Sequence, residues 1–136
     1  MTLDSSVLVS ASDRDHALFE YAKPAALEGR SRNGRLIGHA IAETYSTITL
    51  PPFRRSPVNA IAYVRQFLQR SPTGIEPDAY PAAVEELAAL GVHGPALYDG
   101  LIAIAARDAN LTLLSLDLRA LRTYTAVGVD FRFLQE

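Results

Sequence analysis

Four acidic side chains lie within or directly after largely apolar segments, where solvation does not readily explain them. They are Asp4, Glu43, Asp99 and Asp117, and of these Glu43 has the most polar neighbours, in AIAETYS. An ionised carboxylate is expensive to bury unless it is paired, hydrogen-bonded or bound to a cation. The first question is therefore what compensates these charges.

Each acid also has an ordinary structural role open to it. Asp4 and Asp117 could be N-caps of helices that follow them, and Asp99 could interact with the positive end of its own helix dipole. Asp108 lies on roughly the opposite side of that helix from Asp99 and has Arg107 beside it. We therefore expect Asp108 to lie outside any site.

The elements that must position these side chains alternate between short apolar strands and helices. Strands are predicted over residues 2–4, 35–38, 111–116 and about 130–133. After a turn at Ser5 and Ser6, an interrupted helical stretch is expected to run to about Gly29. Further helices are predicted over residues 40–49, 57–69, 81–90 and 96–110, with one short helix before the last strand.

Proline and serine mark the boundary before the helix at 57–69. Pro51 and Pro52 exclude a helix in PPFRRSP, which we interpret as a loop. Ser56 is a good N-cap and Pro57 suits the first helical position. The helix is therefore expected to begin at Pro57.

Short strands that alternate with helices favour an α/β fold, in which a parallel sheet is covered on both faces. The carboxyl ends of parallel strands, and the helices that start after them, meet at one edge of such a sheet. The four acids would converge there and repel one another. A divalent cation resolves that conflict, and a site of oxygen ligands alone points to Mg²⁺ or Mn²⁺ rather than Zn²⁺.

Composition sets wider limits. The chain has 136 residues, of which 49% are hydrophobic, and we expect a single domain over residues 1–136. It has no cysteine, no stretch typical of a signal peptide and no segment long enough to span a membrane, so a cytoplasmic protein is expected. The net charge of −2 does not by itself indicate a nucleic-acid binder. Lys23 is the single lysine among thirteen basic residues, which either favours a phosphate-rich ligand or reflects compositional bias.

Other chemistries lack support in the sequence. His16, His39 and His93 have no zinc-binding spacing and no cysteine companions, and surface or capping roles are expected for all three. The serine-hydrolase elbow GxSxG, the dinucleotide motif GxGxxG and the P-loop are all missing from the sequence.

Four segments in order, LDSSVLV, IAETYSTIT, LYDGLIAIAA and LLSLDLRAL, resemble a PIN domain, and specifically the VapC-type toxins of bacterial toxin–antitoxin pairs. The resemblance covers nearly the whole chain. It implies a three-layer α/β/α sandwich around a central, mainly parallel sheet. It also implies that Asp4, Glu43, Asp99 and Asp117 form the catalytic and metal-binding quartet.

The same resemblance implies supporting hydroxyl groups at Ser6 and at Ser115, two residues before the last acid. Many relatives carry Thr or Asn where this chain has Ser5, Ser6 and Ser115. A hydroxyl remains at each position, so hydrogen bonding to the metal ligands is still available.

The activity implied is hydrolysis of a phosphodiester in structured cellular RNA, a tRNA or an rRNA, with one or two Mg²⁺ or Mn²⁺ ions that activate a water and stabilise charge on the phosphate. Arginines near the site should contact the RNA. Arg119 is the first candidate, and the others, which could equally be solvated loop residues, are Arg30, Arg32, Arg35, Arg54 and Arg55.

A free ribonuclease would harm its own cell, so the resemblance implies a cognate VapB-type antitoxin, and it also implies a homodimer. A groove for an antitoxin helix could include Tyr45, Phe53, Tyr63 and Phe67, although ordinary core packing is expected for at least half of them. Two alternatives stay open. One is a catalytically silent PIN-like module that binds RNA or protein, and the other is a Mg²⁺-dependent phosphoryl-transfer domain that acts on a small molecule.

Overall fold

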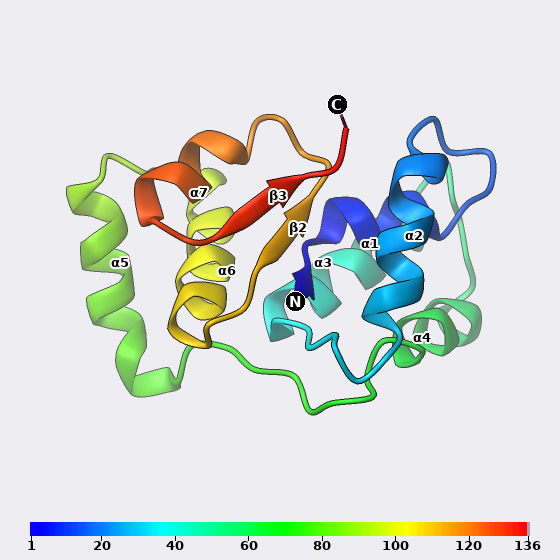
Figure 1. Ribbon diagram of the computed structural model, residues 1–136, viewed down its shortest axis with the longest axis horizontal. Coiled ribbons are helices and arrows are strands. Elements are labelled where there is room, and N and C mark those ends of the chain that lie inside the picture. Colours follow the sequence, from blue (N-terminus) through cyan, green and yellow to red (C-terminus); the bar gives the residue numbers. More distant parts are fainter. Residues whose placement is uncertain (136) are drawn as a thin grey trace.

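The computed structural model describes residues 1–135 and places a short parallel sheet at the centre of the molecule (Figure 1). The strands are β1 (Thr2–Leu3), β2 (Leu113–Ser115) and β3 (Phe131–Phe133), in the order β1-β2-β3. Leu3 pairs with Leu114 and Ser115 pairs with Phe133, both in parallel register. The middle strand of the sheet is therefore β2, with the N-terminal strand β1 on one side and the C-terminal strand β3 on the other.

The helices before the middle of the chain are α1 (Ser5–Ala11), α2 (Phe19–Gly29), α3 (Gly38–Ile48) and α4 (Pro57–Arg65). Those after it are the 3-10 helix η1 (Pro77–Ala79), α5 (Tyr80–Ala89), α6 (Ala96–Asp108) and α7 (Leu121–Val127). None of the helices within residues 1–135 is long and apolar enough to cross a membrane.

Two buried hydrophobic clusters lie one on each face of the sheet, between the sheet and the helices that form the outer layers. Leu113 packs with buried residues of α5, α6 and α7, whereas its neighbour Leu114 packs with Leu3 and with residues of α1 and α2. Consecutive residues of a strand point to opposite faces, so the two clusters lie on opposite sides of β2. Figure 1 shows α5 to α7 on one side and α1, α2 and α4 on the other. The predicted α/β/α sandwich with a parallel sheet is therefore confirmed.

Helix α6 is buried over the continuous run 100–106. Its Gly100 allows α5 to approach closely, because a Cβ at this position would lie 2.6 Å from the Leu87 side chain. The small residues Ala103, Ala105 and Ala106 let the rest of the helix pack tightly under the sheet. This packing fixes the start of α6, which carries Asp99, relative to the strand ends.

Two predicted elements are wrong. The strand at 35–38 is reduced to an isolated parallel bridge between Ile37 and Thr73, because α3 already begins at Gly38. The turn at Ser5 and Ser6 is instead the first turn of α1, since Asp4 caps that helix directly. The sequence shows an apolar run at residues 35–38 and small polar residues at Ser5 and Ser6. It does not show the tertiary contacts that decide whether a strand, a turn or a helix forms there.

The remaining elements occur where they were predicted, with shifted ends. Strand β2 is shorter than the predicted 111–116, and α4 ends at Arg65 rather than Gln69. The Ser56 hydroxyl accepts the Asn59 N–H at 3.2 Å, which confirms the predicted N-cap. Pro51 and Pro52 lie in a turn, as expected.

Candidate metal centre at the carboxyl edge of the sheet

Asp4 is the first residue after β1 and is almost fully buried, with 3% of its surface exposed. Its Oδ1 accepts hydrogen bonds from the backbone N–H groups of Ser6 at 3.0 Å and Val7 at 3.3 Å, and also from the Ser6 hydroxyl. Its Oδ2 accepts a hydrogen bond from the Tyr124 hydroxyl at 2.8 Å. Asp4 is therefore the N-cap of α1, the structural role considered for it, and is also tied to α7.

The two predicted supporting serines connect the ends of β1 and β2. The Ser6 hydroxyl, which donates to Asp4, accepts the Leu116 N–H at 2.8 Å and lies 3.5 Å from the Ser115 hydroxyl. The Ser115 hydroxyl in turn accepts the Asp117 N–H at 3.0 Å. Neutral hydroxyl groups therefore connect the Asp4 carboxylate with the backbone of Leu116 and Asp117 at one edge of the sheet.

Asp117 is the second residue after β2, and its carboxylate is partly exposed. Its Oδ1 accepts the Arg119 N–H at 2.9 Å and lies 3.9 Å from Arg119 Nε. Helix α7 begins four residues later, at Leu121, so the alternative role of Asp117 as a helix N-cap is wrong. The side chain of Arg119 is 97% exposed, which leaves its guanidinium open to solvent.

Asp99 lies in the first turn of α6 and Glu43 near the middle of α3. Burial, together with the charges of Asp117, Glu43 and Asp4, raises the pKa of Asp99 to about 6, although the Arg119 charge opposes the rise. Burial also raises the pKa of Glu43, helped by the charges of Asp4 and Asp117. The charges of Asp4 and Asp117 therefore act on both Glu43 and Asp99, and the four acids together are called the acid edge below.

The pKa of Asp4 is also raised, but the opposing effects on it are burial and hydrogen bonds. Its burial raises the pKa of the carboxyl, whereas hydrogen bonding from the hydroxyls of Ser115, Ser6 and Tyr124 opposes the rise. Burial raises the pKa of the Tyr124 hydroxyl, and the neighbouring Asp4 charge adds to it, so Tyr124 stays a neutral donor. Within the acid edge, Asp4 is thus the acid whose oxygens are already engaged by donors.

Glu43 is the acid with an open oxygen. Its Oε1 is buried and has no hydrogen-bond partner among residues 1–135. His39, one helical turn earlier, has Nε2 at 3.6 Å, which is too long for a hydrogen bond, and burial lowers its pKa so that the ring is neutral at pH 7. A buried carboxylate oxygen without a partner, among other carboxylates and no thiol, fits the ligand preference of Mg²⁺ or Mn²⁺.

The carboxylates do not form a closed cage. Within the described part of the chain, no three acidic or histidine side chains are close enough together to hold one ion as they stand. The acid edge therefore has the donor atoms of a metal site but not its contracted geometry.

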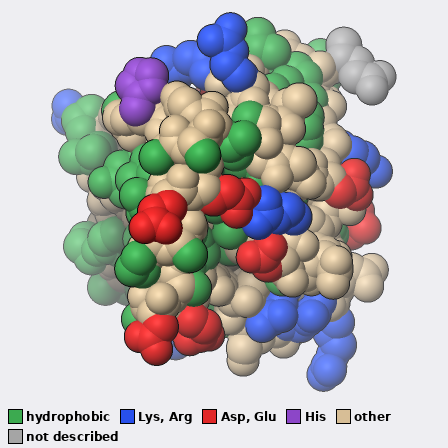
Figure 2. All heavy atoms as spheres, turned by 90° about the vertical axis from the view of Figure 1, so that its left-hand side faces the viewer, with side chains coloured by type: hydrophobic (Ala, Val, Ile, Leu, Met, Phe, Trp, Pro, Cys, Tyr) green, Lys and Arg blue, Asp and Glu red, His purple; other side chains and the backbone are tan. Residues whose placement is uncertain are grey.

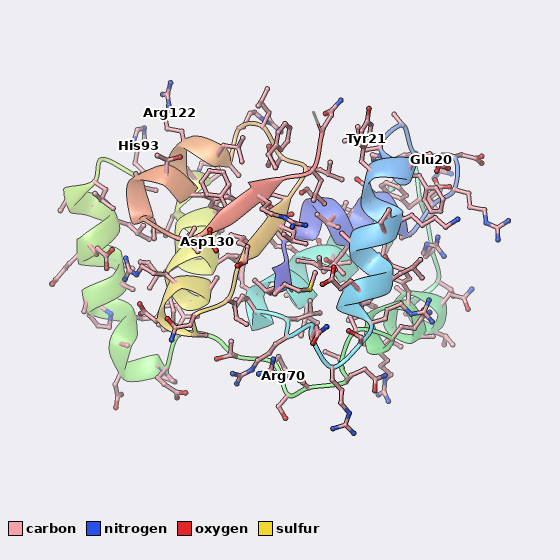
Figure 3. All side chains as sticks on the ribbon, in the orientation of Figure 1. Glu20, Tyr21, Arg70, His93, Arg122 and Asp130 are labelled. Carbon is pink, nitrogen blue, oxygen red and sulfur yellow. The ribbon has the colours of Figure 1, made fainter. Side chains whose placement is uncertain are left out.

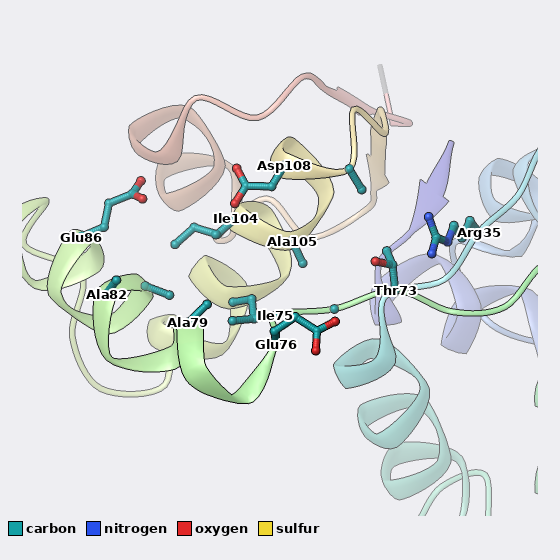
Figure 4. Close-up of a pocket in the computed structure, with 13 residues that line it drawn as sticks. Arg35, Thr73, Ile75, Glu76, Ala79, Ala82, Glu86, Ile104, Ala105 and Asp108 are labelled. Atoms are coloured by element: carbon teal, nitrogen blue, oxygen red, sulfur yellow. The ribbon is translucent and has the colours of Figure 1, made fainter.

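Asp108 lies outside the acid edge, as predicted. It is at the other end of α6, where Arg107 Nε donates to it at 3.0 Å and the Arg107 guanidinium donates to both Glu86 carboxylate oxygens at 2.6 and 3.1 Å. Asp108 and Arg35 are among the side chains that line a cavity of about 480 Å³ between α5, α6 and the segment that contains Thr73 (Figure 4).

Most of the other candidate arginines also lie away from the acids or are engaged. The loop with Arg30, Arg32 and Arg35 is at the opposite edge of the sheet, since the Arg35 N–H donates to the Met1 carbonyl. The Arg55 guanidinium donates to the Ser12 carbonyl after α1. On the face that Figure 2 shows, blue basic side chains are scattered among red acidic ones rather than gathered in one patch.

Of the four aromatic residues considered for an antitoxin groove, Phe67 is buried in the core and Tyr63 packs edge-on against it. The Tyr63 hydroxyl donates to the Leu8 carbonyl. Phe53 stacks on His16, whose ring accepts the Leu18 N–H at 3.0 Å in the turn before α2 and does not cap that helix. Core packing therefore accounts for at least Tyr63 and Phe67.

Sequence reasoning missed three residues around the acid edge. Tyr124 carries no signal in the sequence, because its contact with Asp4 joins residues 120 positions apart. His39 and Tyr98 stack on one another with ring centroids 5.1 Å apart. The spacing of His39 four residues before Glu43, and the position of Tyr98 directly before Asp99, are signals that could have found them.

Comparisons with known proteins agree with this architecture. Residues 1–126 match the PIN domain family. The chain is 35% identical over 129 residues to Ribonuclease VapC40 of Mycobacterium tuberculosis (strain CDC 1551 / Oshkosh), a match that covers 93% of each chain. It is 31% identical over 131 residues to Ribonuclease VapC27 of the same species (strain ATCC 25618 / H37Rv), covering 95% of this chain and 93% of that one.

The fold is also similar to a chain in the solved structure of FitAB bound to an IR36 DNA fragment, with a TM-score of 0.66 at 18% identity over 97% of this chain and 93% of that chain. The resemblance to VapC-type proteins that the four segments indicated is confirmed by the sequence relatives. The chain belongs to the PIN domain family.

Proposed function

We propose that this protein is a Mg²⁺- or Mn²⁺-dependent endoribonuclease toxin that cleaves structured cellular RNA, a tRNA or an rRNA, and is neutralised by a cognate VapB-type antitoxin. The observation that carries the proposal is the acid edge, where Glu43 has a buried carboxylate oxygen without a partner and the charges of neighbouring carboxylates raise the pKa values of Glu43 and Asp99. The relatives named Ribonuclease VapC40 and Ribonuclease VapC27 support it.

Glu43, Asp99 and Asp117 would hold the metal ion, together with Asp4. When bound, Mg²⁺ or Mn²⁺ lowers the pKa of a water molecule and stabilises charge on the scissile phosphate. The chain itself supplies position: Ser6 and Ser115 hold the backbones after β1 and β2, and Tyr124 holds the Asp4 carboxylate. These contacts hold Asp4 and the backbone at Asp117 in place, and the carboxylates would still have to move closer together to hold one ion.

Arg119 is proposed to bind an RNA phosphate. It follows Asp117 by two residues, and its guanidinium is almost completely exposed. A planar guanidinium can donate two parallel hydrogen bonds to phosphate oxygens. Arg119 would thus bring a phosphate close to the acids, whose own charge repels it.

We propose a single domain over residues 1–136 that forms a homodimer and binds its antitoxin through exposed apolar side chains. Val58 and Ile61, one turn apart on α4, are 75% and 40% exposed, and Leu50 nearby in sequence is 57% exposed. Apolar side chains that gather on a surface are typical of contacts with a partner. They support a protein partner without distinguishing a second copy from an antitoxin.

The ribonuclease proposal is tested with the purified full-length chain on total RNA, in Mg²⁺, in Mn²⁺ and in chelator. Discrete cleavage products are expected with either ion and not with chelator. The Asp99→Asn variant should be inactive, whereas Asp108→Asn, on the same helix but outside the acid edge, is the matched control and should cleave normally. Intact RNA under every condition would contradict the proposal.

Two further assays with the same purified chain distinguish the two alternative functions. A silent module would bind RNA in a filter or anisotropy assay and leave it uncut in both ions. A small-molecule phosphoryl-transfer domain would leave RNA intact and release phosphate from nucleotides in a metal-dependent way.

The toxin proposal needs its own test. Induced expression should arrest growth of the host, and co-expression of the short reading frame beside this gene should restore it. Normal growth on induction of an active ribonuclease would contradict the toxin role alone.

A further inference from the structure

His39 and Tyr98 form an aromatic pair that the proposed mechanism does not use. Their rings are stacked, with centroids 5.1 Å apart and planes inclined by 7°. His39 is in the first turn of α3, one turn before Glu43, and Tyr98 directly precedes Asp99 in the first turn of α6. Two rings from different helices therefore lie beside two members of the acid edge.

The pair keeps much of its surface in solvent. Tyr98 is 49% exposed and the His39 side chain 34%, whereas Tyr124, also beside the acids, is fully buried. A stacked pair with exposed aromatic surface can accept a further planar group, since nucleobases stack on Tyr and His rings in single-stranded RNA complexes.

The charge around the pair favours such a contact over an ionic one. Four carboxylates lie at the acid edge, and the chain as a whole has a net charge of −2. Phosphates approaching these acids are repelled, and Arg119 is one exposed cation against them. Stacking gives RNA a source of affinity that does not depend on opposite charge.

We propose that His39 and Tyr98 are a stacking platform for an unpaired nucleobase of the RNA, next to the phosphate that is cleaved. The proposal rests on the ribonuclease function proposed above and refines its substrate. A base inside a duplex has both faces covered by its neighbours, so the platform selects nucleotides in loops, bulges or single strands. Tyr98 and His39 then act as substrate-binding residues rather than as metal ligands.

Steady-state cleavage by the full chain tests the platform. Tyr98→Ala is expected to raise KM about ten-fold, because one base–aromatic contact is lost, with kcat changed by less than about two-fold. Tyr98→Phe keeps the ring and should restore KM. The matched control is Tyr21→Ala, a tyrosine of similar exposure, 43%, on α2 away from α6 (Figure 3), and its KM should equal that of the parent.

Direct binding gives a readout without cleavage. The probe is a single-stranded RNA of about ten nucleotides with 2-aminopurine in place of one adenine, added to the Asp117→Asn variant, which is expected not to cleave it. Stacking should change the 2-aminopurine fluorescence, and the change should disappear with the further Tyr98→Ala substitution. The same probe annealed to its complement should show little change.

Three outcomes overturn the platform. A fall in kcat at constant KM for Tyr98→Ala would mean that the ring pair positions Asp99 and Glu43 and does not bind a base. A particle mass of folded Tyr98→Ala that differs from that of the parent in light scattering would mean that Tyr98 belongs to a protein interface. An unchanged KM for Tyr98→Ala would mean that Tyr98 does not contact a base. If Tyr98→Ala unfolds, an unchanged KM for Tyr98→Leu would mean the same.

Failure of the underlying function looks different. If the parent chain does not cleave RNA but its Asp117→Asn form still changes 2-aminopurine fluorescence in a Tyr98-dependent way, the ribonuclease proposal fails and the stacking contact stands.

Discussion

The two ends of helix α6 carry charged groups in opposite situations. At the last turn, Arg107 pairs with Glu86 and Asp108 and also donates to the Val127 carbonyl at 3.0 Å. At the first turn, Asp99 faces three other carboxylates, and burial and their charges raise its pKa to about 6. Both ends suit the helix dipole, which favours an acid at the start and a base at the end.

The difference predicts that the Arg107 cluster stabilises the fold and that the acid edge binds a ligand. The Arg107 cluster contains its own cation, so its charges are balanced inside the molecule. At the acid edge, neutral hydroxyl groups of Ser6 and Tyr124 donate to Asp4, and the cation nearest to Asp117, Arg119, is 97% exposed to solvent. Unbalanced buried charge weakens a fold, and it is typical of sites that bind something.

The largest difference expected between the two ends of α6 is in their effect on RNA cleavage. Asp99→Asn should lower the rate of RNA cleavage by at least about 10²- to 10³-fold, because it removes a carboxylate that we propose to be a metal ligand. Arg107→Gln, at the other end of α6, should change the rate per folded molecule by less than about two-fold. Equal losses from the two substitutions would show that the ends of α6 do not differ in role.

The hydroxyl donors give the next largest effect. Ser6→Ala should lower cleavage by about 10- to 100-fold, since Ser6 joins Asp4 to the backbone after β2 and groups that orient metal ligands have effects of that order. Ser31, whose hydroxyl donates to the Glu28 carbonyl at the opposite edge of the sheet, provides the control Ser31→Ala. A similar loss for both serines would assign the effect to folding, which a thermal melt would reveal.

The pH dependence of stability should have opposite signs at the two ends. The pKa of Asp99 is raised in the folded state, so its contribution is fully present below the unfolded pKa and is lost as the pH rises through about 6. Asp99→Asn should therefore stabilise the metal-free protein at pH 7.5, by about 1 to 2 kcal/mol after allowance for its partial exposure, and not at pH 3.5. Urea unfolding at the two pH values measures this.

Glu86 completes that test. Hydrogen bonds from Arg107 lower the pKa of its carboxyl, so its contribution is present above the unfolded pKa and is lost as the pH falls through the folded one. Glu86→Gln should destabilise the protein at pH 7.5 and have less effect at low pH. Changes of the same sign for Asp99→Asn and Glu86→Gln at pH 7.5 would contradict the comparison.

The smallest effect expected is the stability carried by the Arg107 cluster. Arg107→Gln should lower the free energy of unfolding by about 1 kcal/mol, because the pair is partly exposed. For a chain of this size that is a fall of about 3–6 °C in Tm, measurable by differential scanning calorimetry. Saturating Mn²⁺ should raise the Tm of Arg107→Gln as much as that of the parent, since the ion is expected at the other end of the helix.

Local patterns were enough to predict most of the fold. The apolar run that contains Ile102 predicts a buried helix, and Ser56 before Pro57 predicts a helix start, and both occur. The strand at 35–38 could not be excluded from its sequence, because what ends it is the start of α3 at Gly38 and the pairing of Ile37 with Thr73. Strand pairing is a tertiary property that a short apolar stretch does not encode alone.

The four acids were also selected from local context, and separating Asp99 from Asp108 required only the helical period. Their role in metal binding stays a prediction. What the sequence did not reveal is how the acids are held. The Tyr124 hydroxyl reaches Asp4 from another element, and the exposed rings of His39 and Tyr98 meet across two helices. Contacts between side chains that are far apart in sequence depend on the packed structure.

The dual role of Asp4 has a consequence for how this protein can evolve. Asp4 caps α1 and accepts the Tyr124 hydroxyl, so replacing it costs stability whether or not the chain cuts RNA. Asp99 is different, because its loss is expected to relieve repulsion. In a lineage released from selection for cleavage, Asp99 is free to drift early and Asp4 late. A descendant that keeps Asp4 but has lost Asp99 would therefore record a former nuclease, whereas Asp4 alone is no sign of present activity.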